Sequence, residues 1–355
     1  MSQNLYVLPD LQVIVMERLA IDGYGRFLGT ELGQIVVKEK RKVIERKNPR
    51  SLRQIVFSGK GSISSEAIKL LGKHGVDILF LDFDGSVIAR VSPPMLRTVA
   101  VRKEQYYAYK DERGMILSKE FVSAKMKNQI AVLGSLAKRR KETDPGASET
   151  MVSARNKIKE FLQDVDDISG SCIDEIRGTI QGFEGGASRE YWGALTVIFP
   201  QDFEFQGRSG RYAEDPVNSM LNYGYGILQG ETLRAIHFAG LDPYGGYLHV
   251  DRSGRGSLIL DFMEEFRQQI VDKVVIRLIT KGQVKPDDFR SKEGLCRMRK
   301  SMRRLLLKEM LSRLEDFIRV ENRKIAWCNV MLRQARSMAK FLRGQGLYTG
   351  FYLRW

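Results

Sequence analysis

Short hydrophobic runs bounded by turn-forming residues characterise the first 93 residues of the chain. The runs are rich in β-branched and aromatic side chains and are bounded by Gly, Pro or Asp, a pattern that predicts antiparallel β-strands. They cover residues 5–8, 12–16, 34–37, 54–57, 77–81 and 87–91. One helix is expected among them, capped by Ser64 and followed by Gly72 and Gly75. Asp84-Gly85 predicts a hairpin between the last two strands.

From Met95 onward, apolar side chains recur at intervals of three and four residues, which predicts helices. The clearest helix starts at Asp215, which can act as an N-cap before Pro216 at the first helical position. Its expected end is near Gly240. Further helices are expected at about 115–141, 148–165, 187–199, 257–281, 292–318 and 320–343. The pattern therefore predicts an α+β protein with a β-rich domain at 1–93 and a larger all-α-helical domain at 94–355.

The composition is that of an ordinary globular protein, with 43% hydrophobic and 28% charged residues. No apolar run approaches the ~18 residues that a membrane-spanning helix needs, so we expect no membrane partner. The N-terminal sequence lacks the charged and apolar regions of a signal peptide. Three widely spaced cysteines fit neither a disulfide framework nor a zinc site. A reducing cytoplasmic location is the simplest expectation.

Positive charge is concentrated near the C-terminus. The chain has 58 Lys and Arg against 43 Asp and Glu, a net charge of +15. Residues 292–355 hold 16 basic and 5 acidic residues, so +11 of that excess lies in the last fifth of the chain. Such concentration indicates a polyanionic partner, and nucleic acid is favoured over membrane. The basic residues expected to contact it are Arg297, Arg299, Lys300, Arg303 and Arg304, on a helix whose leucines are expected to be buried.

Two acidic residues and a histidine lie near one another in the sequence. His249 follows Gly245-Gly246 in an expected loop, where a functional side chain is easily presented. On the following helix, Asp261 and Glu264 lie three residues apart, on the side opposite an apolar stripe. Histidine and carboxylate ligands together suit a hard divalent cation. The alternative interpretation of the two acids is a solvated helix face, which the helix alone favours.

A further carboxylate is expected upstream of this group. Glu190 lies in 188–194, which is interpreted as the start of a helix, where the helix dipole also favours an acid. Glu184, in the preceding glycine-rich segment, is a competing candidate. Spacing and chemistry do not choose between these two residues.

The segment 78–86 carries a motif with a different chemical interpretation. Asp82 and Asp84 stand in an Asp-x-Asp-Gly-Ser pattern that resembles the nucleophile motif of haloacid-dehalogenase-type phosphatases. Those enzymes place the motif in a parallel α/β sheet, whereas here a strand follows within two residues. The hairpin interpretation is therefore favoured.

Taken in order, several blocks of the chain resemble CRISPR-associated protein one, the spacer-acquisition integrase or endonuclease of CRISPR adaptation. The blocks are the β-rich front, the Glu190 helix, residues 215–225, the Gly-Tyr-Leu-His loop at 246–249 and residues 261–267. The resemblance covers essentially the whole chain. It implies a β-sandwich-like N-terminal domain that dimerises and a helical, metal-binding catalytic domain.

The resemblance also implies a ligand set and partners. Carried over by position, Glu190, His249 and Glu264 match the ligands of a Mg²⁺ or Mn²⁺ ion, although the family often has Asp at the place of Glu264. Asp261 matches a neighbouring acid with a supporting role. These assignments choose Glu190 over Glu184. The implied partners are double-stranded DNA, including branched forms, a second copy of the chain, and the small second CRISPR adaptation protein in a hetero-oligomer.

The implied reaction joins the 3′-hydroxyl ends of short captured DNA to the repeat by transesterification. Water in place of the hydroxyl would make the same centre a nuclease. One alternative is a non-catalytic, basic DNA-binding scaffold, in which the acids are surface residues. A less favoured alternative is an aspartate-nucleophile phosphatase that uses Asp82 and Asp84.

Overall fold

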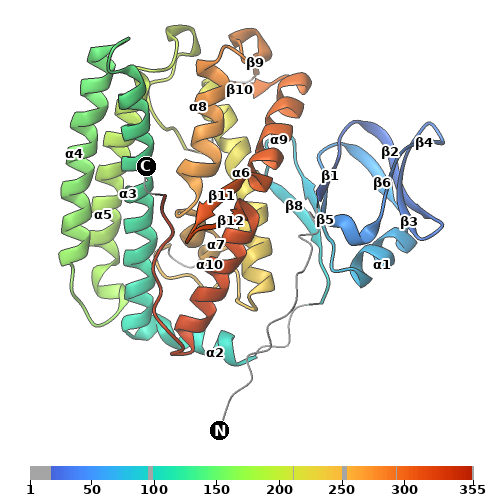
Figure 1. Ribbon diagram of the computed structural model, residues 1–355, viewed down its shortest axis with the longest axis horizontal. Coiled ribbons are helices and arrows are strands. Elements are labelled where there is room, and N and C mark those ends of the chain that lie inside the picture. Colours follow the sequence, from blue (N-terminus) through green and yellow to red (C-terminus); the bar gives the residue numbers. More distant parts are fainter. Residues whose placement is uncertain (1–16, 95–98, 211, 250–253, 293, 354–355) are drawn as a thin grey trace. The chain divides into compact units, whose positions relative to one another are not determined.

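The computed structural model describes residues 17–94, 99–210, 212–249, 254–292 and 294–353. The expected strands at 5–8 and 12–16 lie outside these residues. The chain divides into two compact units, a strand-rich one formed by residues up to Phe83 with Ile88–Pro94, and a helical one formed by Asp84–Val87 and the chain from Met95 (Figure 1). The expected α+β class, with strands first and helices second, is confirmed.

From Glu17 to Pro94, the strand-rich unit forms two four-stranded sheets, ordered β1-β5-β7-β8 and β4-β3-β2-β6. The strands are β1 (Glu17–Ile21), β2 (Tyr24–Glu31), β3 (Gln34–Glu39), β4 (Lys42–Lys47), β5 (Leu52–Phe57), β6 (Lys60–Ile63), β7 (Asp77–Leu81) and β8 (Val87–Val91). Buried side chains of both sheets, among them Leu28, Ile35, Ile55 and Ile78, form one hydrophobic core with Leu71 of helix α1 (Ser65–Lys73). Ser64 caps α1, as expected, by accepting a hydrogen bond from the Ala67 N–H at 3.1 Å.

The expectation that all these strands are antiparallel was wrong. β1, β5 and β7 pair in parallel, and so do β2 and β6, whereas β2, β3 and β4 are antiparallel. Parallel neighbours need a crossover connection, and the segment with β6 and α1 supplies it between β5 and β7. Every residue of β5 is buried, the pattern of a central parallel strand that is covered on both faces.

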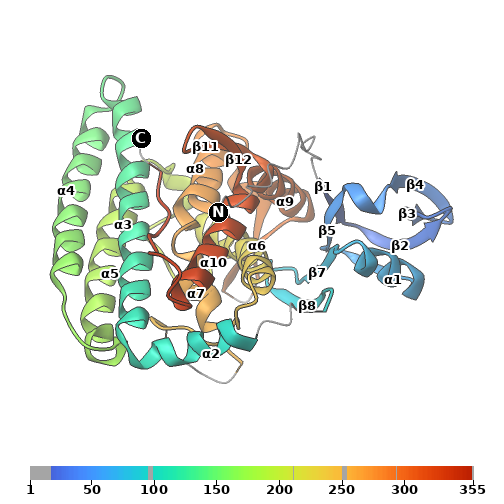
Figure 2. The same cartoon turned by 60° about the horizontal axis from the view of Figure 1, so that its bottom comes forward.

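The helical unit is built from nine described helices and two short hairpins. The helices are α2 (Val99–Tyr107), α3 (Glu112–Arg140), α4 (Pro145–Asp167), α5 (Ile173–Thr196), α6 (Pro216–Phe238), α7 (Ser257–Met263), α8 (Lys273–Thr280), α9 (Lys300–Glu315) and α10 (Trp327–Leu342). The hairpins are β9 (Phe289–Lys292) with β10 (Leu295–Met298) and β11 (Phe317–Val320) with β12 (Arg323–Ala326). They replace the first residues of the helices expected at 292–318 and 320–343, so that α9 starts only at Lys300 and α10 at Trp327. The long helices α3, α4 and α5 lie side by side (Figures 1 and 2).

Two helices differ from the sequence-based prediction in ways that affect the site. The α5 helix begins at Ile173, fourteen residues before the expected start, so Glu190 lies inside a helix. The expected helix at 257–281 is interrupted, because α7 ends at Met263 and residues Gln268–Asp272 form a π-helical turn before α8. Such π-bulges are frequent at functional sites, since they change the direction in which neighbouring side chains point.

The aromatic segment 348–353 docks on the helical unit. The buried Glu265 carboxylate accepts hydrogen bonds from the Tyr348 hydroxyl and, at 2.8 Å, from the Phe351 N–H. The Phe351 ring stacks on Phe266 and meets the edge of Trp327. Within the described ranges, no helix has both the length and the apolar character needed to cross a membrane.

Candidate functional site

Asp261 holds the loop that carries His249. Its fully buried carboxylate accepts hydrogen bonds from the backbone N–H groups of Tyr247, Leu248 and His249, at 2.6, 3.0 and 2.9 Å. It also lies 2.6 Å from Nδ1 of the His249 ring. This contact fixes the ring orientation and leaves Nε2 as the nitrogen that can bind a ligand. Asp261 therefore supports His249, which is the geometry that metal-binding histidines commonly have.

The close approach of this loop to α7 requires a glycine. A Cβ atom on Gly246 would lie 2.6 Å from the backbone carbon of Ser257 and 2.7 Å from the Leu258 nitrogen. Gly246 thus allows the loop that carries His249 to lie against the backbone at the start of α7.

Glu264 lies just after α7 and is buried, with 3% of its surface exposed. Its Oε2 atom is 2.8 Å from the Lys125 ammonium, and its Oε1 atom is 3.2 Å from the Arg267 guanidinium. Burial raises the pKa of this carboxyl, but Arg267 and Lys125 lower it more, so the net pKa lies below the usual value. The solvated-face interpretation is therefore wrong for both acids, since Asp261 and Glu264 are inside the protein.

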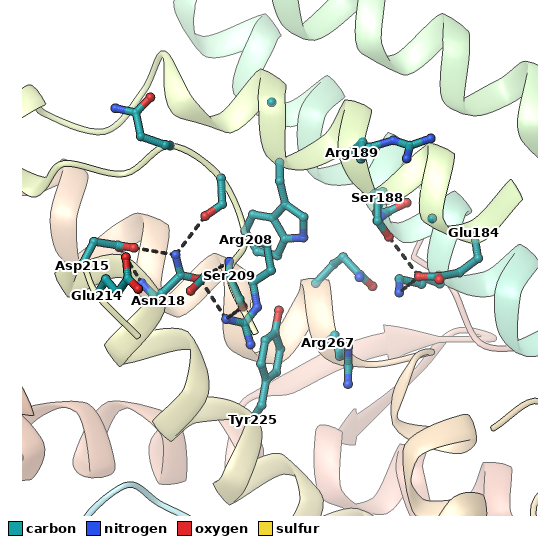
Figure 3. A pocket seen from close by; sticks show the side chains of 18 of the residues that line it. Glu184, Ser188, Arg189, Arg208, Ser209, Glu214, Asp215, Asn218, Tyr225 and Arg267 are labelled. Carbon is teal, nitrogen blue, oxygen red and sulfur yellow. Dashed lines mark hydrogen bonds and ion pairs between the residues drawn. The ribbon is translucent and has the colours of Figure 1, made fainter. Parts of the chain in front are cut away.

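Lys125 of α3 joins Glu264 to a second carboxylate. Its ammonium also forms an ion pair with Glu184 of α5, whose Oε1 accepts a 3.0 Å hydrogen bond from the Ser188 hydroxyl (Figure 3). Burial lowers the pKa of Lys125, but the two carboxylates raise it further, so the lysine stays charged. The structure thus places one cation between two carboxylates that come from different elements.

Glu190 is separated from this cluster. It lies on α5 six residues after Glu184, which turns it about 240° around the helix axis at ~100° per residue. Its carboxylate pairs with Lys157 of α4 at 3.2 Å. The choice of Glu190 over Glu184 is therefore not supported by this arrangement. The early start of α5 explains the difference, because Glu184 lies in the helix and not in a loop before it.

The donor atoms of the cluster fit a hard divalent cation. Two carboxylates and one imidazole are the ligand types that Mg²⁺ and Mn²⁺ accept. Oε2 of Glu264 is buried and, among the described residues, accepts no well-directed hydrogen bond. In the described ranges no three His, Cys, Asp or Glu side chains already converge as the ligands of a bound ion do. Lys125 supplies the positive charge between the two glutamates.

A cavity of about 770 Å³ opens beside Lys125 and Glu184 and extends to α6 (Figure 3). Among the described residues, three arginines line it, at positions 189, 208 and 267. The guanidinium groups of Arg208 and Arg267 lie over the Tyr225 ring, at 5.3 and 4.8 Å from its centre. Planar guanidinium groups match phosphate oxygens in pairs, so the cavity can hold a phosphate next to the carboxylates. Its acidic lining residues are Glu184, Glu204, Glu214 and Asp215.

A hydrogen bond from its hydroxyl to Asp272 fixes the position of Tyr225. Its hydroxyl donates a 2.6 Å hydrogen bond to Asp272, a fully buried carboxylate on the π-helical turn, and the Tyr191 hydroxyl donates another at 2.9 Å. Burial raises the pKa of Asp272 to about 6, although the two hydroxyls and nearby arginines oppose this shift. Asp272 therefore anchors the aromatic ring on which the two arginines rest.

The basic residues expected on one helix are divided between two elements. Arg297 lies on β10 and Arg299 caps α9, where its Nε donates a 2.7 Å hydrogen bond to the Asp287 carbonyl. Lys300 and Arg304 are exposed on α9, and Arg303 is half-buried. The apolar side of the helix is buried as expected, through Met302, Leu306, Leu307 and Met310. The exposed positions therefore leave a basic helix face available to a polyanion.

The Asp82 and Asp84 motif has a turn geometry. Asp82 accepts a hydrogen bond from the Phe83 N–H at 2.7 Å, and Asp84 accepts bonds from the Ser86 N–H and hydroxyl at 2.9 and 2.6 Å. Gly85 has a positive φ of 86°, as this turn requires. The two acids thus stabilise the connection between β7 and β8, in agreement with the favoured hairpin interpretation.

Sequence reasoning missed Lys125 and Arg267. Lys125 follows Phe121, Val122 and Ala124 on a helix stretch that is buried throughout. A lysine within a buried helix stretch needs an anionic partner. The position of Lys125 among apolar residues could therefore have indicated a nearby carboxylate. Arg267 lies three residues after Glu264, the spacing of an ion pair within a helix.

Comparison with known proteins identifies the family. The model of the family described as CRISPR associated protein Cas1 matches residues 19–311. A relative from Archaeoglobus fulgidus, CRISPR-associated endonuclease Cas1 1, is 46% identical over 344 residues, which is 95% of this chain and 100% of the relative.

Two solved structures have the same fold. A casposase bound to integration product matches with a TM-score of 0.78 and 27% identity, over 94% of this chain and 92% of that one. A chain of a Cas6-RT-Cas1–Cas2 complex matches with a TM-score of 0.75 and 21% identity, over 95% of this chain and 36% of that one. The family match spans both the sheets and the candidate site. This chain belongs to the CRISPR associated protein Cas1 family.

Proposed function

We propose that this protein is a metal-dependent DNA endonuclease and integrase of CRISPR adaptation. The observation that carries the proposal is the cluster in which Lys125 bridges Glu184 and the buried Glu264. The His249 ring, oriented by Asp261, is near enough to Glu264 to help lower the pKa of that carboxyl. Family membership supports it, because the Archaeoglobus fulgidus relative is named an endonuclease and the casposase structure holds an integration product.

In this proposal, Glu184, Glu264 and the free Nε2 of His249 hold the Mg²⁺ or Mn²⁺ ion. The bound ion would supply Lewis acidity for phosphodiester chemistry at neutral pH. Glu184 takes the place that the sequence resemblance gave to Glu190, since Glu184 is the carboxylate that shares Lys125 with Glu264. Asp261 keeps the His249 ring in position for this role.

The remaining residues bind and orient the DNA. Arg208 and Arg267, seated on Tyr225, are placed to hold a phosphate of the strand that enters the cavity. The 3′-hydroxyl of a captured DNA then attacks a phosphodiester of the repeat, forming one P–O bond while another breaks. The released strand carries a new 3′-hydroxyl, so the exchange needs no external energy source. Attack by water instead gives hydrolysis and accounts for nuclease activity.

The proposed partners follow from charge and family. Double-stranded DNA suits the excess of basic residues in 292–355 and the exposed Lys300 and Arg304 on α9. We further propose a homodimer and assembly with Cas2, the small second CRISPR adaptation protein. The solved Cas6-RT-Cas1–Cas2 complex is one such assembly, and one of its chains shares this fold.

Strand transfer tests the proposal. A short duplex with 3′-hydroxyl ends is incubated with a plasmid that carries a CRISPR repeat, Mn²⁺ and the Cas2 protein, and joined products are counted. Glu184→Gln should reduce joining by a factor of 10² or more, the loss expected when a group acting at the reacting centre is removed. Glu190→Gln is the matched control on the same helix and should keep activity close to that of the unmodified protein.

Several outcomes contradict the proposal. Full joining by Glu184→Gln, or joining that persists when all divalent ions are chelated, would remove the assigned metal centre. Loss of joining in Glu190→Gln but not in Glu184→Gln, with both proteins folded by circular dichroism, would return the choice of ligand to the sequence-based one, and equal loss in both would remove the ground for preferring Glu184. DNA binding with no joining or cleavage under any condition would favour the non-catalytic scaffold. Duplexes with blocked 3′ ends should not be joined.

A further inference from the structure

A second cavity, of about 660 Å³, lies among α3, α8 and α9. None of its lining residues lines the cavity beside Glu184. Along α3, Lys125 of the candidate site and Arg139 of this cavity are fourteen residues apart, or about 21 Å at ~1.5 Å per residue. The second cavity is therefore a separate feature of the helical unit.

Positive charge dominates the lining of this cavity. Its cationic residues are Arg139, Arg140, Lys273, Arg277, Lys281 and Arg313. Its two acids are already paired, Glu309 with Arg277 at 2.5 Å and Asp316 with Arg313 at 3.2 Å. After these pairs are made, Arg139, Lys273 and Lys281 have no acidic neighbour among the described lining residues, whereas Asp144, outside the lining, attracts Arg140. Such an excess of like charge is unfavourable unless an anion joins it.

Lys273 is the residue of this cavity for which the lack of a counter-charge is clearest. It is half-buried and, among the described residues, has neither a hydrogen-bond nor an ion-pair partner. Burial lowers its pKa, and the nearby charges of Arg313 and Arg139 lower it further, to about 8. Partly buried lysines are usually paired, so the missing counter-charge indicates a ligand that is not part of the chain.

The chemistry of the lining selects the kind of anion. Guanidinium groups at the rim offer paired N–H donors that fit the oxygens of a phosphate, and an ammonium suits the same group as a point charge. The three cations without an acidic neighbour match a phosphate better than a single carboxylate. The hydroxyls of Ser135, Thr280 and Ser312 lie around the cavity, and apolar side chains such as Leu136 and Val274 complete it. The volume is within the range of small-ligand sites.

We propose that the cavity among α3, α8 and α9 is a phosphate-binding site, with Lys273 and Arg139 as its principal ligands. The phosphate belongs to the DNA backbone or to a free nucleotide, two sources with the same chemistry at the contact. If the source is DNA, the site holds the backbone about 21 Å from the Lys125 cluster and helps set how a duplex lies on the helical unit. The inference does not depend on the assignment of the metal ligands.

The test measures binding and thermal unfolding of the full chain with three probes, pyrophosphate, ATP and a short DNA duplex, at constant ionic strength. Pyrophosphate should raise the midpoint of unfolding, because a ligand that binds the folded state stabilises it. Lys273→Gln should weaken pyrophosphate binding about tenfold, the effect of losing one charged contact. Lys159→Gln, which removes an exposed lysine of α4, is the control and should bind like the unmodified protein.

Competition experiments distinguish the two possible sources of the phosphate, DNA and a nucleotide. If it is DNA, pyrophosphate displaces the duplex, and Lys273→Gln lowers the magnitude of the salt slope of duplex binding by about one. If it is a nucleotide, ATP binds with a Kd below that of pyrophosphate while duplex binding is unchanged by Lys273→Gln. Either result supports the site.

Other results overturn it. Equal binding of pyrophosphate by Lys273→Gln and the unmodified protein, or binding of none of the three probes, would exclude a phosphate site here. Two further variants show whether a loss of binding is caused by misfolding. Arg139→Gln changes an exposed side chain and should also weaken pyrophosphate binding, whereas Lys273→Arg keeps the charge and should retain it. Unchanged binding in a folded Arg139→Gln protein would remove Arg139 from the site.

Discussion

At the scale of single residues, the candidate site depends on a buried lysine that touches two acids. Lys125→Met keeps the length of the side chain but leaves Glu184 and Glu264 without the cation between them. Breaking a buried ion pair by removing one partner costs about 3–5 kcal/mol, so the free energy of unfolding should fall by roughly that amount in EDTA. Urea denaturation followed by circular dichroism measures it.

The same variant tests whether the two glutamates bind a metal ion. Without Lys125, Mn²⁺ should raise the unfolding midpoint by more than it does in the unmodified protein, because the ion then supplies the missing positive charge. Lys157→Met is the matched control, since Lys157 pairs with Glu190 on the exposed side of α5. An Mn²⁺ effect of the same size in all three proteins would argue against the assigned ligands.

Asp272 gives a prediction for pH. Burial raises its pKa in the folded state from the usual value of 3.8 to about 6, so the folded protein holds this proton more tightly than the unfolded chain. Its contribution to stability is fully present below about pH 4 and is lost as the pH rises through 6, by about 3 kcal/mol in all. Asp272→Asn should remove this part of the pH dependence between pH 4 and 7. The measurement is urea denaturation across that range, and identical profiles for the two proteins would contradict the prediction.

At the residue scale, the contact between His249 and Asp261 could be predicted from the sequence, whereas the contact of Glu184 with the Lys125 that pairs with Glu264 could not. The Gly-Tyr-Leu-His loop and the 261–267 block pointed to His249 with Asp261, and the structure joins them. The choice between Glu184 and Glu190 depended on where α5 begins. Four glycines between 178 and 186 obscure the helical pattern there, because glycine lowers helix propensity by about 1 kcal/mol per residue.

At the scale of elements, one of those glycines has a packing role. A Cβ atom on Gly186 would lie 2.6 Å from Cζ of Phe161, so α4 and α5 approach closely at this point. Gly186→Ala should destabilise the protein by about 1–3 kcal/mol, the usual cost of overfilling a packed interface. Gly182→Ala on the same helix is the control, because its Cβ meets nothing within 4 Å, and it should be neutral or stabilising by up to about 1 kcal/mol. Equal thermal midpoints for the two variants would contradict this account.

The sequence predicted less well those features of helices and strands that depend on tertiary contacts. The apolar runs of β5 and β7 were identified correctly, but a local pattern does not report the direction of the neighbouring strand. The π-helical turn at Gln268–Asp272 also interrupts a pattern that looks continuous in the sequence. In contrast, helix α6 began where the Asp215-Pro216 cap predicted, because a capping signal is local.

At the scale of the whole molecule, the distribution of charge predicts how DNA binding responds to salt. If six phosphates are neutralised, the log–log slope of affinity against salt should be near −5 for duplex DNA, about −0.9 per phosphate. Lys300 and Arg304 are exposed on α9, so the double variant Lys300→Gln, Arg304→Gln should reduce the magnitude of this slope by about two. Lys73→Gln, on helix α1 of the strand-rich unit, is the control for a general loss of charge. Fluorescence anisotropy of a labelled duplex, measured from low to physiological salt, gives the slopes. An unchanged slope in the double variant would mean that the basic face of α9 does not contact the DNA backbone, and that the charge excess of residues 292–355 acts elsewhere.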